Sequence, residues 1–335
     1  MSSELSIKKL SEDSNSILLS ITGKDAKPVI INTVRRIIIG EIPTHAYCNI
    51  IIDKNTSVYD NDDVRHRISM IPIFNVEHTV DLFDRLKFYQ DYPKLAEKYD
   101  LALFDSAGND IKLAVDQKYL NKVNDNINAS AYDKKIELRG FMHNKSQNTV
   151  DFTTHDCEGD IIKEYKNRPP ILINKLKAGQ IFSFKATSRL STVKCGGHQW
   201  DVAVIDRYAR IKDGFELGIT TLGALSCKSI IFKACSLIVK KLEIIKNHVL
   251  DNYANEKGNN IKLILHQESH TMGYLINFFL QDHKEVVLSG FTQPHPMIDE
   301  IIINFVVSNG KSMNIFADVI EDIKMIFLNF IRQLE

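Results

Sequence analysis

The sequence predicts an α+β fold in which two halves pack through long helices and a separate module interrupts the first half. Apolar residues recur at helical spacing in two long stretches, at 230–249 and 316–334. Short strand-like segments precede each stretch. Between 74 and 168 the chain is more polar and only weakly periodic, which is typical of an inserted unit.

The first 42 residues predict a β-hairpin followed by an amphipathic helix. Apolar residues alternate loosely with polar ones over 5–22, on both sides of a Ser/Asn/Asp turn. The helix begins near Pro28, which suits a first helical turn, and it must end before Pro43. Its apolar face comprises Ile30, Val34, Ile37, Ile38 and Ile42.

Strands are predicted on both sides of the polar module. One covers 46–58, and a short helix follows it, capped by Asp62 or Asp63 and ended at Pro72. After Pro169 and Pro170, three further strands are predicted, at 171–179, 181–190 and 200–211. The long helix that follows has an apolar face comprising Ile230, Ala234, Leu237, Ile238, Leu242, Ile245 and Val249.

The polar residues 251–260 are the best linker candidate, because they contain Gly258 and no apolar repeat. Beyond them the predicted elements are strand 261–267, helix 270–281, strands 285–290 and 300–307, a turn at 308–310 and a terminal helix. The apolar face of the terminal helix comprises Phe316, Val319, Ile320, Ile323, Ile326, Phe327, Phe330 and Leu334. A face this wide needs a large partner surface, which we expect the 230–249 helix and its neighbour at 29–42 to provide.

Composition favours a globular intracellular protein. The 335 residues are 44% hydrophobic, and 42 basic side chains balance 42 acidic ones. This balance argues against direct nucleic-acid binding, which needs positive charge. Charged residues interrupt every apolar run before a bilayer could be crossed, and the polar start is no secretory signal. The five scattered cysteines indicate reduced thiols.

Two clusters could carry chemistry, and together they define an alternative function, a metal-dependent hydrolase. In an extended segment, His266, Glu268 and His270 would share a strand face and could bind a metal. Cys195 and His198 could form a nucleophile pair or two zinc ligands, although a glycine turn between strands explains them better. Phosphate-binding loops, paired catalytic carboxylates and Ser/His/Asp signatures are not visible.

Two separated blocks resemble two subunits of cellular RNA polymerases. Asn32–Pro72 resembles the opening signature of the alpha-like subunit, and Glu268–Pro296 resembles its small partner, called L in archaea. The lysine-rich turn at Lys175–Gln180 and the later His198 and Trp200 follow the same pattern. These subunits are normally separate polypeptides that pair, so their order on one chain implies a fused pseudo-dimer.

The resemblance implies a division into domains. The alpha-like dimerisation domain would be discontinuous, at 1–56 and 171–250, with a β-rich insertion at 57–170. A linker at 251–260 would join it to an L-type domain at 261–335. Many relatives bind zinc or an iron–sulfur cluster through several cysteines of the insertion, but this chain offers only Cys157 there. We therefore expect no metal and no other cofactor.

The implied function is a non-catalytic platform that nucleates a multisubunit polymerase. Its partners would be the two largest subunits, the second-largest first, and small zinc-ribbon-type subunits, with no sequence-specific nucleic-acid contact and no membrane. The residues expected to dock on a partner are Arg35, Arg36, Pro43, Thr44, His66, Arg67 and Pro72. The residues expected to join the two halves are Ile30, Val34, Ile38, Leu237, Ile238, Ile245, Thr271, Gly273, Ile323, Phe327 and Phe330.

At the junction of the predicted strand and helix, the resemblance gives Thr271 and Gly273 a structural role in a tight turn and close helix packing. Fused pairs are associated with large DNA viruses that carry their own polymerase. This implies that the protein works in the host cytoplasm, in a viral factory, and is packaged in the virion.

Overall fold

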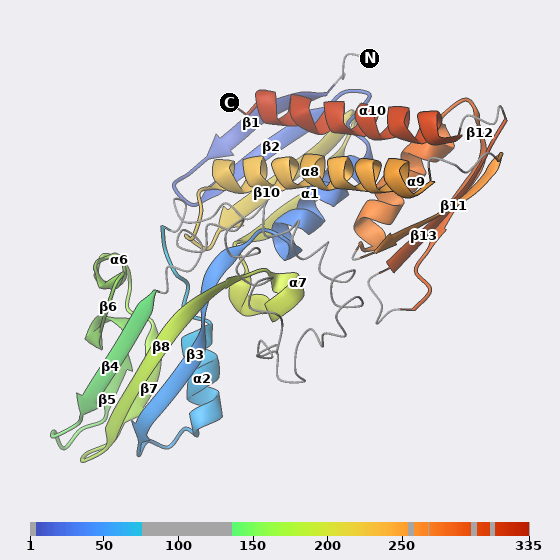
Figure 1. The fold of residues 1–335 in the computed structure, drawn as a ribbon. Coiled ribbons are helices and arrows are strands. Elements are labelled where there is room, and N and C mark those ends of the chain that lie inside the picture. The colour runs from blue at the N-terminus through green and yellow to red at the C-terminus, as the bar shows by residue number, and fades with distance from the viewer. Residues whose placement is uncertain are drawn as a thin grey trace, which may run out of the picture.

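The computed structural model describes residues 5–75, 136–253, 258–266, 268–295, 300–308 and 312–334. Helices and strands are mixed along the chain, as the sequence predicts for an α+β fold. Two sheets lie at opposite ends of a layer of helices, and a third strand-rich unit projects from this body (Figure 1).

The first sheet joins the beginning of the chain to residues just after the third unit. Its order is β1-β2-β10-β9, with every neighbouring pair antiparallel. The predicted hairpin is confirmed as β1 and β2. The strands are β1 (Ser6–Glu12), β2 (Ser16–Thr22), β9 (Ala203–Ile211) and β10 (Gly214–Thr221). The helices α1 (Pro28–Gly40) and α8 (Cys227–Tyr253) contact this sheet.

The C-terminal half has the predicted order of elements, with ends shifted by only a few residues. Its sheet has the order β11-β13-β12. The strands are β11 (Asn260–His266), β12 (Val286–Thr292) and β13 (Glu300–Val307). The helices are α9 (His270–Asp282) and α10 (Ser312–Arg332). Residues 309 and 310 of the predicted turn lie outside the described residues.

The third unit is built around a sheet of order β3-β8-β4-β6 and a two-stranded sheet, β5-β7. Its strands are β3 (Thr44–Asn55), β4 (Glu137–His143), β5 (Val150–Thr153), β6 (Cys157–Gly159), β7 (Leu172–Leu176) and β8 (Ile181–Ser191). Its helices are α2 (Asn61–Ser69) and α6 (Ile162–Lys166), and α7 (Val193–Gly196) follows β8. Phe152 packs edge-to-face on Phe182 and Phe184 in its core.

The predicted limits of the insertion, 57–170, fall inside this unit. β3 pairs with β8 from Thr44, opposite Ser191, to Asn55, opposite Phe182. β8 also pairs with β4, so strands that we assigned to the dimerisation domain share a sheet with the insertion. The division into domains stays a prediction, and a cut at 56 or 171 would separate paired strands.

Two local predictions need correction. The cap of α2 is Asp60 rather than Asp62 or Asp63, because its Oδ1 accepts hydrogen bonds from both of their backbone N–H groups, at 2.8 and 2.9 Å. The predicted linker begins too early, since α8 continues to Tyr253. Residues 254–257 lie outside the described part of the chain, and β11 already begins at Asn260.

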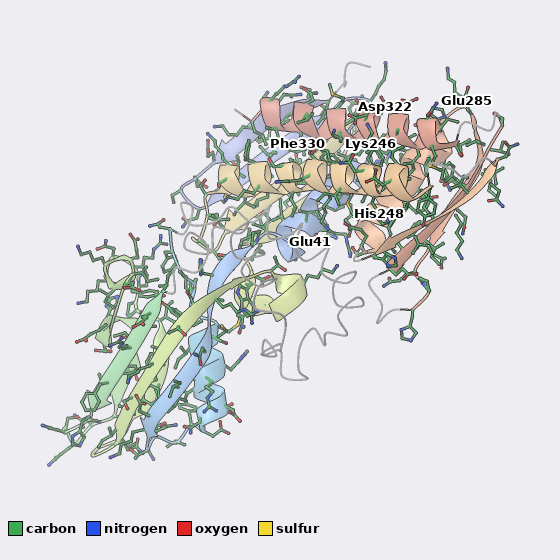
Figure 2. The ribbon with its side chains drawn as sticks, in the orientation of Figure 1. Glu41, Lys246, His248, Glu285, Asp322 and Phe330 are labelled. Atoms are coloured by element: carbon green, nitrogen blue, oxygen red, sulfur yellow. The ribbon has the colours of Figure 1, made fainter. Side chains whose placement is uncertain are left out.

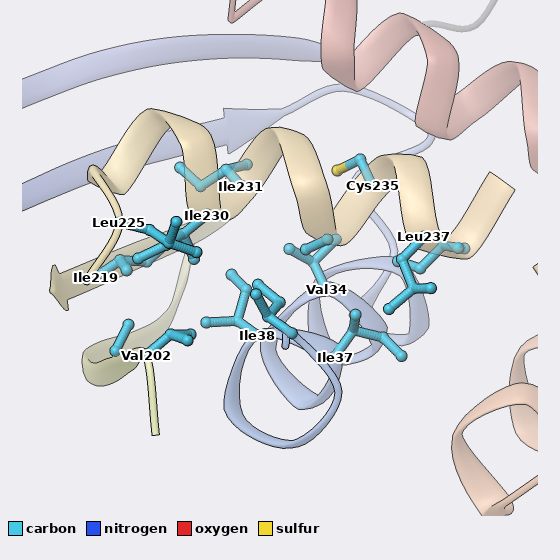
Figure 3. Close-up of a cluster of buried hydrophobic side chains, with 14 of the residues drawn as sticks. Val34, Ile37, Ile38, Val202, Ile219, Leu225, Ile230, Ile231, Cys235 and Leu237 are labelled. Carbon is cyan, nitrogen blue, oxygen red and sulfur yellow. The ribbon is translucent and has the colours of Figure 1, made fainter. Parts of the chain in front are cut away.

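Part of the hydrophobic core lies where α1 meets α8. Figure 3 shows Val34, Ile37 and Ile38 of α1 close to Ile230 and Leu237 of α8. All of these side chains are buried. None of the described helices combines the length and the apolar character needed to cross a membrane.

Candidate functional site

The two long helices connect the halves by reaching across to each other's sheet. α8 begins beside its own sheet, where Cys227 Sγ lies 3.5 Å from the Ile219 carbonyl of β10. It ends beside the other sheet, where Tyr253 Oη accepts a hydrogen bond from Ile264 N of β11, at 3.2 Å. α10 runs in the opposite direction, from the C-terminal sheet to the first sheet. Just beyond its last residue, Gln333 donates to the Leu5 carbonyl and accepts from Ile7 N at β1.

α8 and α10 lie side by side along this layer, and Figure 2 places Phe330 between them. The residues predicted to join the halves are all buried: Ile30, Val34, Ile38, Leu237, Ile238, Ile245, Thr271, Gly273, Ile323, Phe327 and Phe330. We also predicted that the α10 face would pack on α1. The extensive contacts of α10 are instead with α8 and α9. α1 makes separate contacts with the same two helices.

Gly273 allows close packing within its own half. A Cβ added there would lie 2.9 Å from Ile301 Cγ2 and 2.9 Å from the Phe291 ring. These residues belong to β13 and β12, so α9 lies close to its own sheet because position 273 has no side chain. The assignment of Gly273 to the contact between halves stays a prediction.

Two ion pairs cross between α8 and α10 in a reciprocal pattern. Lys246 Nζ lies 2.6 Å from Glu321 Oε1, and Lys324 Nζ lies 3.0 Å from Glu243 Oε1. Each helix thus presents a glutamate and, three residues later, a lysine. Both pairs are partly exposed, and pairs of this kind stabilise by only about 0–1 kcal/mol.

A third ionic contact is buried and has no such symmetry. Lys241 of α8 places its Nζ 2.6 Å from Glu41 Oε2 and 3.1 Å from Glu268 Oε2. Glu41 caps the end of α1, where Figure 2 labels it, and Glu268 immediately precedes Ser269, the N-cap of α9. The Glu268 side chain is only 2% exposed. One lysine of the first half therefore holds a carboxylate from each half.

Burial and attraction act in opposite directions on these three groups. Burial disfavours the charged form of Lys241, but the attraction of Glu268 and Glu41 outweighs it and raises the lysine pKa. Burial likewise acts against the Glu41 carboxylate, yet Lys241 keeps its pKa below the ordinary value. For Glu268 burial dominates, so its pKa is raised even though Lys241 contacts it. Its Oε1 has no hydrogen-bond partner among the described residues.

Beside this cluster, Arg36 joins α1 to α9. Its Nε donates to Thr271 Oγ1 at 2.7 Å, which gives Thr271 a role between the halves. Arg36 lies in a pocket of about 210 Å³ that Tyr274 and Phe291 also line. The neighbouring Arg35 donates to Asn32 Oδ1 at 3.0 Å and remains partly exposed.

The other residues predicted to dock on a partner differ in their exposure. His66 is exposed, and the partly exposed Arg67 guanidinium lies 4.3 Å from the Tyr59 ring centre. Pro72 is half-buried, and its carbonyl accepts a hydrogen bond from the Tyr165 hydroxyl. Pro43 and Thr44 are buried at the start of β3, so we remove both from the docking surface.

The residues of the hydrolase alternative do not converge. His266 points to Glu300, with Nδ1 and Oε2 3.3 Å apart, while His270 packs edge-to-face on Phe291. Glu268 is held by Lys241 instead. Within the described residues, no three His, Cys, Asp or Glu side chains gather as metal ligands do.

For the second cluster of that alternative, His198 lies 3.3 Å from Asp201 and is exposed. The side chain of Cys195 lies outside the described part of the structure.

Sequence reasoning missed Lys241 and Glu41. One signal was available, because position 241 lies on the apolar face of the predicted helix, three residues after Ile238 and four before Ile245. A lysine in the middle of such a face needs a buried counter-ion. The identity of that counter-ion could not be predicted, since Glu41 and Glu268 are remote in sequence.

Comparison with known proteins identifies the protein family. Residues 260–333 match the family model of the RNA polymerase Rpb3/Rpb11 dimerisation domain. The chain is 33% identical to the RNA polymerase subunit Rpo11 of Metallosphaera sedula over 84 residues, which are 90% of that protein and 24% of this one. The chain belongs to the Rpb3/Rpb11 family of DNA-directed RNA polymerase subunits.

Two further relatives extend the match. A protein of Acanthamoeba polyphaga mimivirus, provisionally named a DNA-directed RNA polymerase subunit, is 24% identical over 300 residues, covering 86% of this chain and 80% of the relative. The rpac1 subunit of RNA polymerases I and III of Dictyostelium discoideum is 44% identical over 64 residues, 18% of its length. The family predicted from the sequence is confirmed, and the relative that matches along most of the chain comes from a large DNA virus.

Proposed function

We propose that this subunit is a non-catalytic assembly platform whose two halves form a pseudo-dimer within one chain. The observation that carries the proposal is the way α8 and α10 span the two halves. Each helix begins near one sheet and ends at the other. Packing of this kind buries an apolar face that neither half could cover alone.

The coverage of the relatives supports a fused pair. The match to Rpo11 takes up nearly all of that protein but only 24% of this chain. The remaining residues contain a second long helix, α8, which packs on α10 as a partner subunit would. We assign the alpha-like domain to 1–56 and 171–253, the insertion to 57–170 and the L-type domain to 260–335, with the linker shortened to 254–259 because α8 continues to Tyr253 and β11 begins at Asn260.

The pseudo-dimer predicts that the covalent linker is dispensable once the chain has folded. A protease site between residues 254 and 257 would avoid Gly258 and Asn259, whose carbonyls accept hydrogen bonds from Ser312 and Val307. The linker supplies an effective concentration of roughly millimolar, whereas the apolar interface should bind at about nanomolar or better. After cleavage, both fragments should co-elute in size-exclusion chromatography at micromolar concentration.

The control for that experiment is a chain with the same inserted site and no protease. Two well-folded fragments that elute separately would contradict the pseudo-dimer, because the halves would then be independent domains.

We further propose that Arg35 on α1 and His66 and Arg67 on α2 dock the large polymerase subunits, the second-largest first. These groups are partly or fully exposed, and arginine suits interfaces because its planar fork binds carboxylates and carbonyls. Small zinc-ribbon-type subunits would join later. Arg36 is a poorer test residue, since reversing its charge would also break the hydrogen bond to Thr271.

Charge reversal at this surface should prevent assembly without unfolding the subunit. We expect Arg35→Glu with Arg67→Glu to reduce recovery of the co-expressed large subunits by at least about tenfold, a loss of roughly 1.4 kcal/mol or more. Lys262→Glu, an exposed reversal on β11, is the matched control. Equal recovery with the double variant would place the docking surface elsewhere.

We also infer that the protein works in infected host cells and is packaged in the virion. Its viral relative supports this inference. Mass spectrometry of purified particles should detect the chain in constant ratio to the large polymerase subunits. A particle with those subunits but without this chain would contradict packaging.

A further inference from the structure

We propose that the contact between Lys241 and Glu268 selects the pairing of unlike halves and disfavours assembly of two chains through like halves. The inference rests on the proposed pseudo-dimer and adds the residues that determine its specificity. Glu268 is the residue that enforces the choice, because the buried cation that it contacts, Lys241, belongs to the first half of the chain.

Pairing of like halves is a real competitor, because the α8 and α10 surfaces are similar. Both helices carry a wide buried apolar face. Both also carry the glutamate and lysine that form the reciprocal ion pairs, Glu243 with Lys246 on α8 and Glu321 with Lys324 on α10. Two copies of α8, or two of α10, could satisfy those pairs equally well. Neither the apolar faces nor the exposed charges therefore discriminate between partners.

The buried charges differ between the helices at one equivalent position. Lys241 precedes Glu243 by two residues, and the residue that precedes Glu321 by two is Val319, which is buried. If two C-terminal halves paired, each Glu268 would face valine instead of lysine. Burying a carboxylate without a counter-ion is strongly unfavourable. If two N-terminal halves paired, Lys241 would still contact Glu41. The free-energy cost of pairing like halves therefore arises at Glu268, in the paired C-terminal halves.

The surroundings of Glu268 reinforce this asymmetry. The cations that stabilise its charge are Lys241 and, less strongly, Lys194, and both belong to the first half. The Glu41 carboxylate, which repels it, also belongs to that half but is held by Lys241. Native pairing therefore supplies Glu268 with the attraction of two cations from the first half.

Lysine cross-linking of the intact chain can report both pairings. In native pairing Lys246 and Lys324 both contact Glu321, so a short cross-linker should join them within one chain. A link between two copies of Lys246 can arise only from two chains paired through like halves. We expect wild type, refolded at high concentration, to give the first link almost exclusively.

Neutralising Glu268 should allow like halves to pair. In Glu268→Gln, which preserves shape, the ratio of Lys246–Lys246 to Lys246–Lys324 links should rise on the order of a hundredfold, with a dimer visible by light scattering. Glu268→Met is a second variant of similar volume. Asp322→Asn is the matched control: it neutralises an exposed carboxylate of α10 and should leave the ratio unchanged.

The outcomes separate this inference from the pseudo-dimer itself. Absence of the Lys246–Lys324 link in wild type would contradict the proposed pseudo-dimer. A wild-type link together with an unchanged ratio in both Glu268 variants would overturn only the selection role. Failure of both variants to fold would also count against selection, because Glu268 would then be needed for native stability.

Discussion

Phe327→Ala should lower the free energy of unfolding by about 3–5 kcal/mol, a large part of the margin of a typical domain. Phe327 is fully buried on the face of α10 that packs on α8 and α9. Removing the ring leaves a cavity between the halves, and the long helices cannot close it without moving along their whole contact. We expect a loosely folded or aggregation-prone chain, measured by denaturant unfolding and light scattering.

Met325→Ala is the control for this prediction, because Met325 lies on the same helix and is 41% exposed. It should change the free energy of unfolding by no more than about 0.5 kcal/mol. If Phe327→Ala unfolded at the same denaturant concentration as Met325→Ala, the buried face of α10 would not join the halves.

Local pattern was enough to predict most of the dimerisation elements. Apolar spacing predicted α1, α8 and α10, and the proline residues at 28 and 43 predicted where α1 begins and must stop. The order of strands and helices after Asn260 was also readable, because each element there is short, periodic and bounded by polar turns. In these segments burial follows directly from the spacing of apolar residues.

The pairing of remote strands could not be read in the same way. β3 and β8 lie more than a hundred residues apart in sequence, and the alternation of β8, like the apolar residues of β3, fits a strand of any sheet. Nothing local assigns them to the third unit rather than to the first sheet. The boundary that the resemblance implies lies at residue 57, whereas the sheet itself begins at Thr44.

The site shows the same division between local and non-local information. The sequence identified Thr271 and Arg36 as candidates, but only the fold shows that they bind each other across the two halves. The exposure of Arg35, His66 and Arg67 and the burial of Pro43 and Thr44 likewise depend on which segments cover them. Residue type alone does not distinguish these two groups.

Lys241→Met should be about as damaging as the loss of Phe327, at roughly 3–5 kcal/mol near neutral pH, because it leaves two buried carboxylates without their shared cation. Methionine retains much of the apolar stem, so the loss would report mainly on charge. Lys246→Met removes the nearby lysine that binds Glu321 at the surface. This control should cost no more than about 1 kcal/mol.

The loss in Lys241→Met should also depend on pH, and its sign is determined by Glu41 and Glu268. With Lys241 present, the Glu41 pKa lies below its ordinary value and the Glu268 pKa above it. Without the lysine, burial should raise the pKa of both carboxyls above the unfolded value of roughly 4.3, although Lys194 and Arg36 remain nearby. Groups whose pKa is raised in this way stabilise the fold only when protonated, so the stability of the variant falls as pH rises.

The difference in free energy of unfolding between Lys241→Met and wild type should therefore shrink as pH is lowered from 8 to about 5. The deficit of Lys246→Met should stay small throughout. A Lys241→Met deficit that is constant over this range in urea unfolding would mean that water or a rearranged side chain neutralises the two carboxylates, and that Lys241 is not their essential counter-ion.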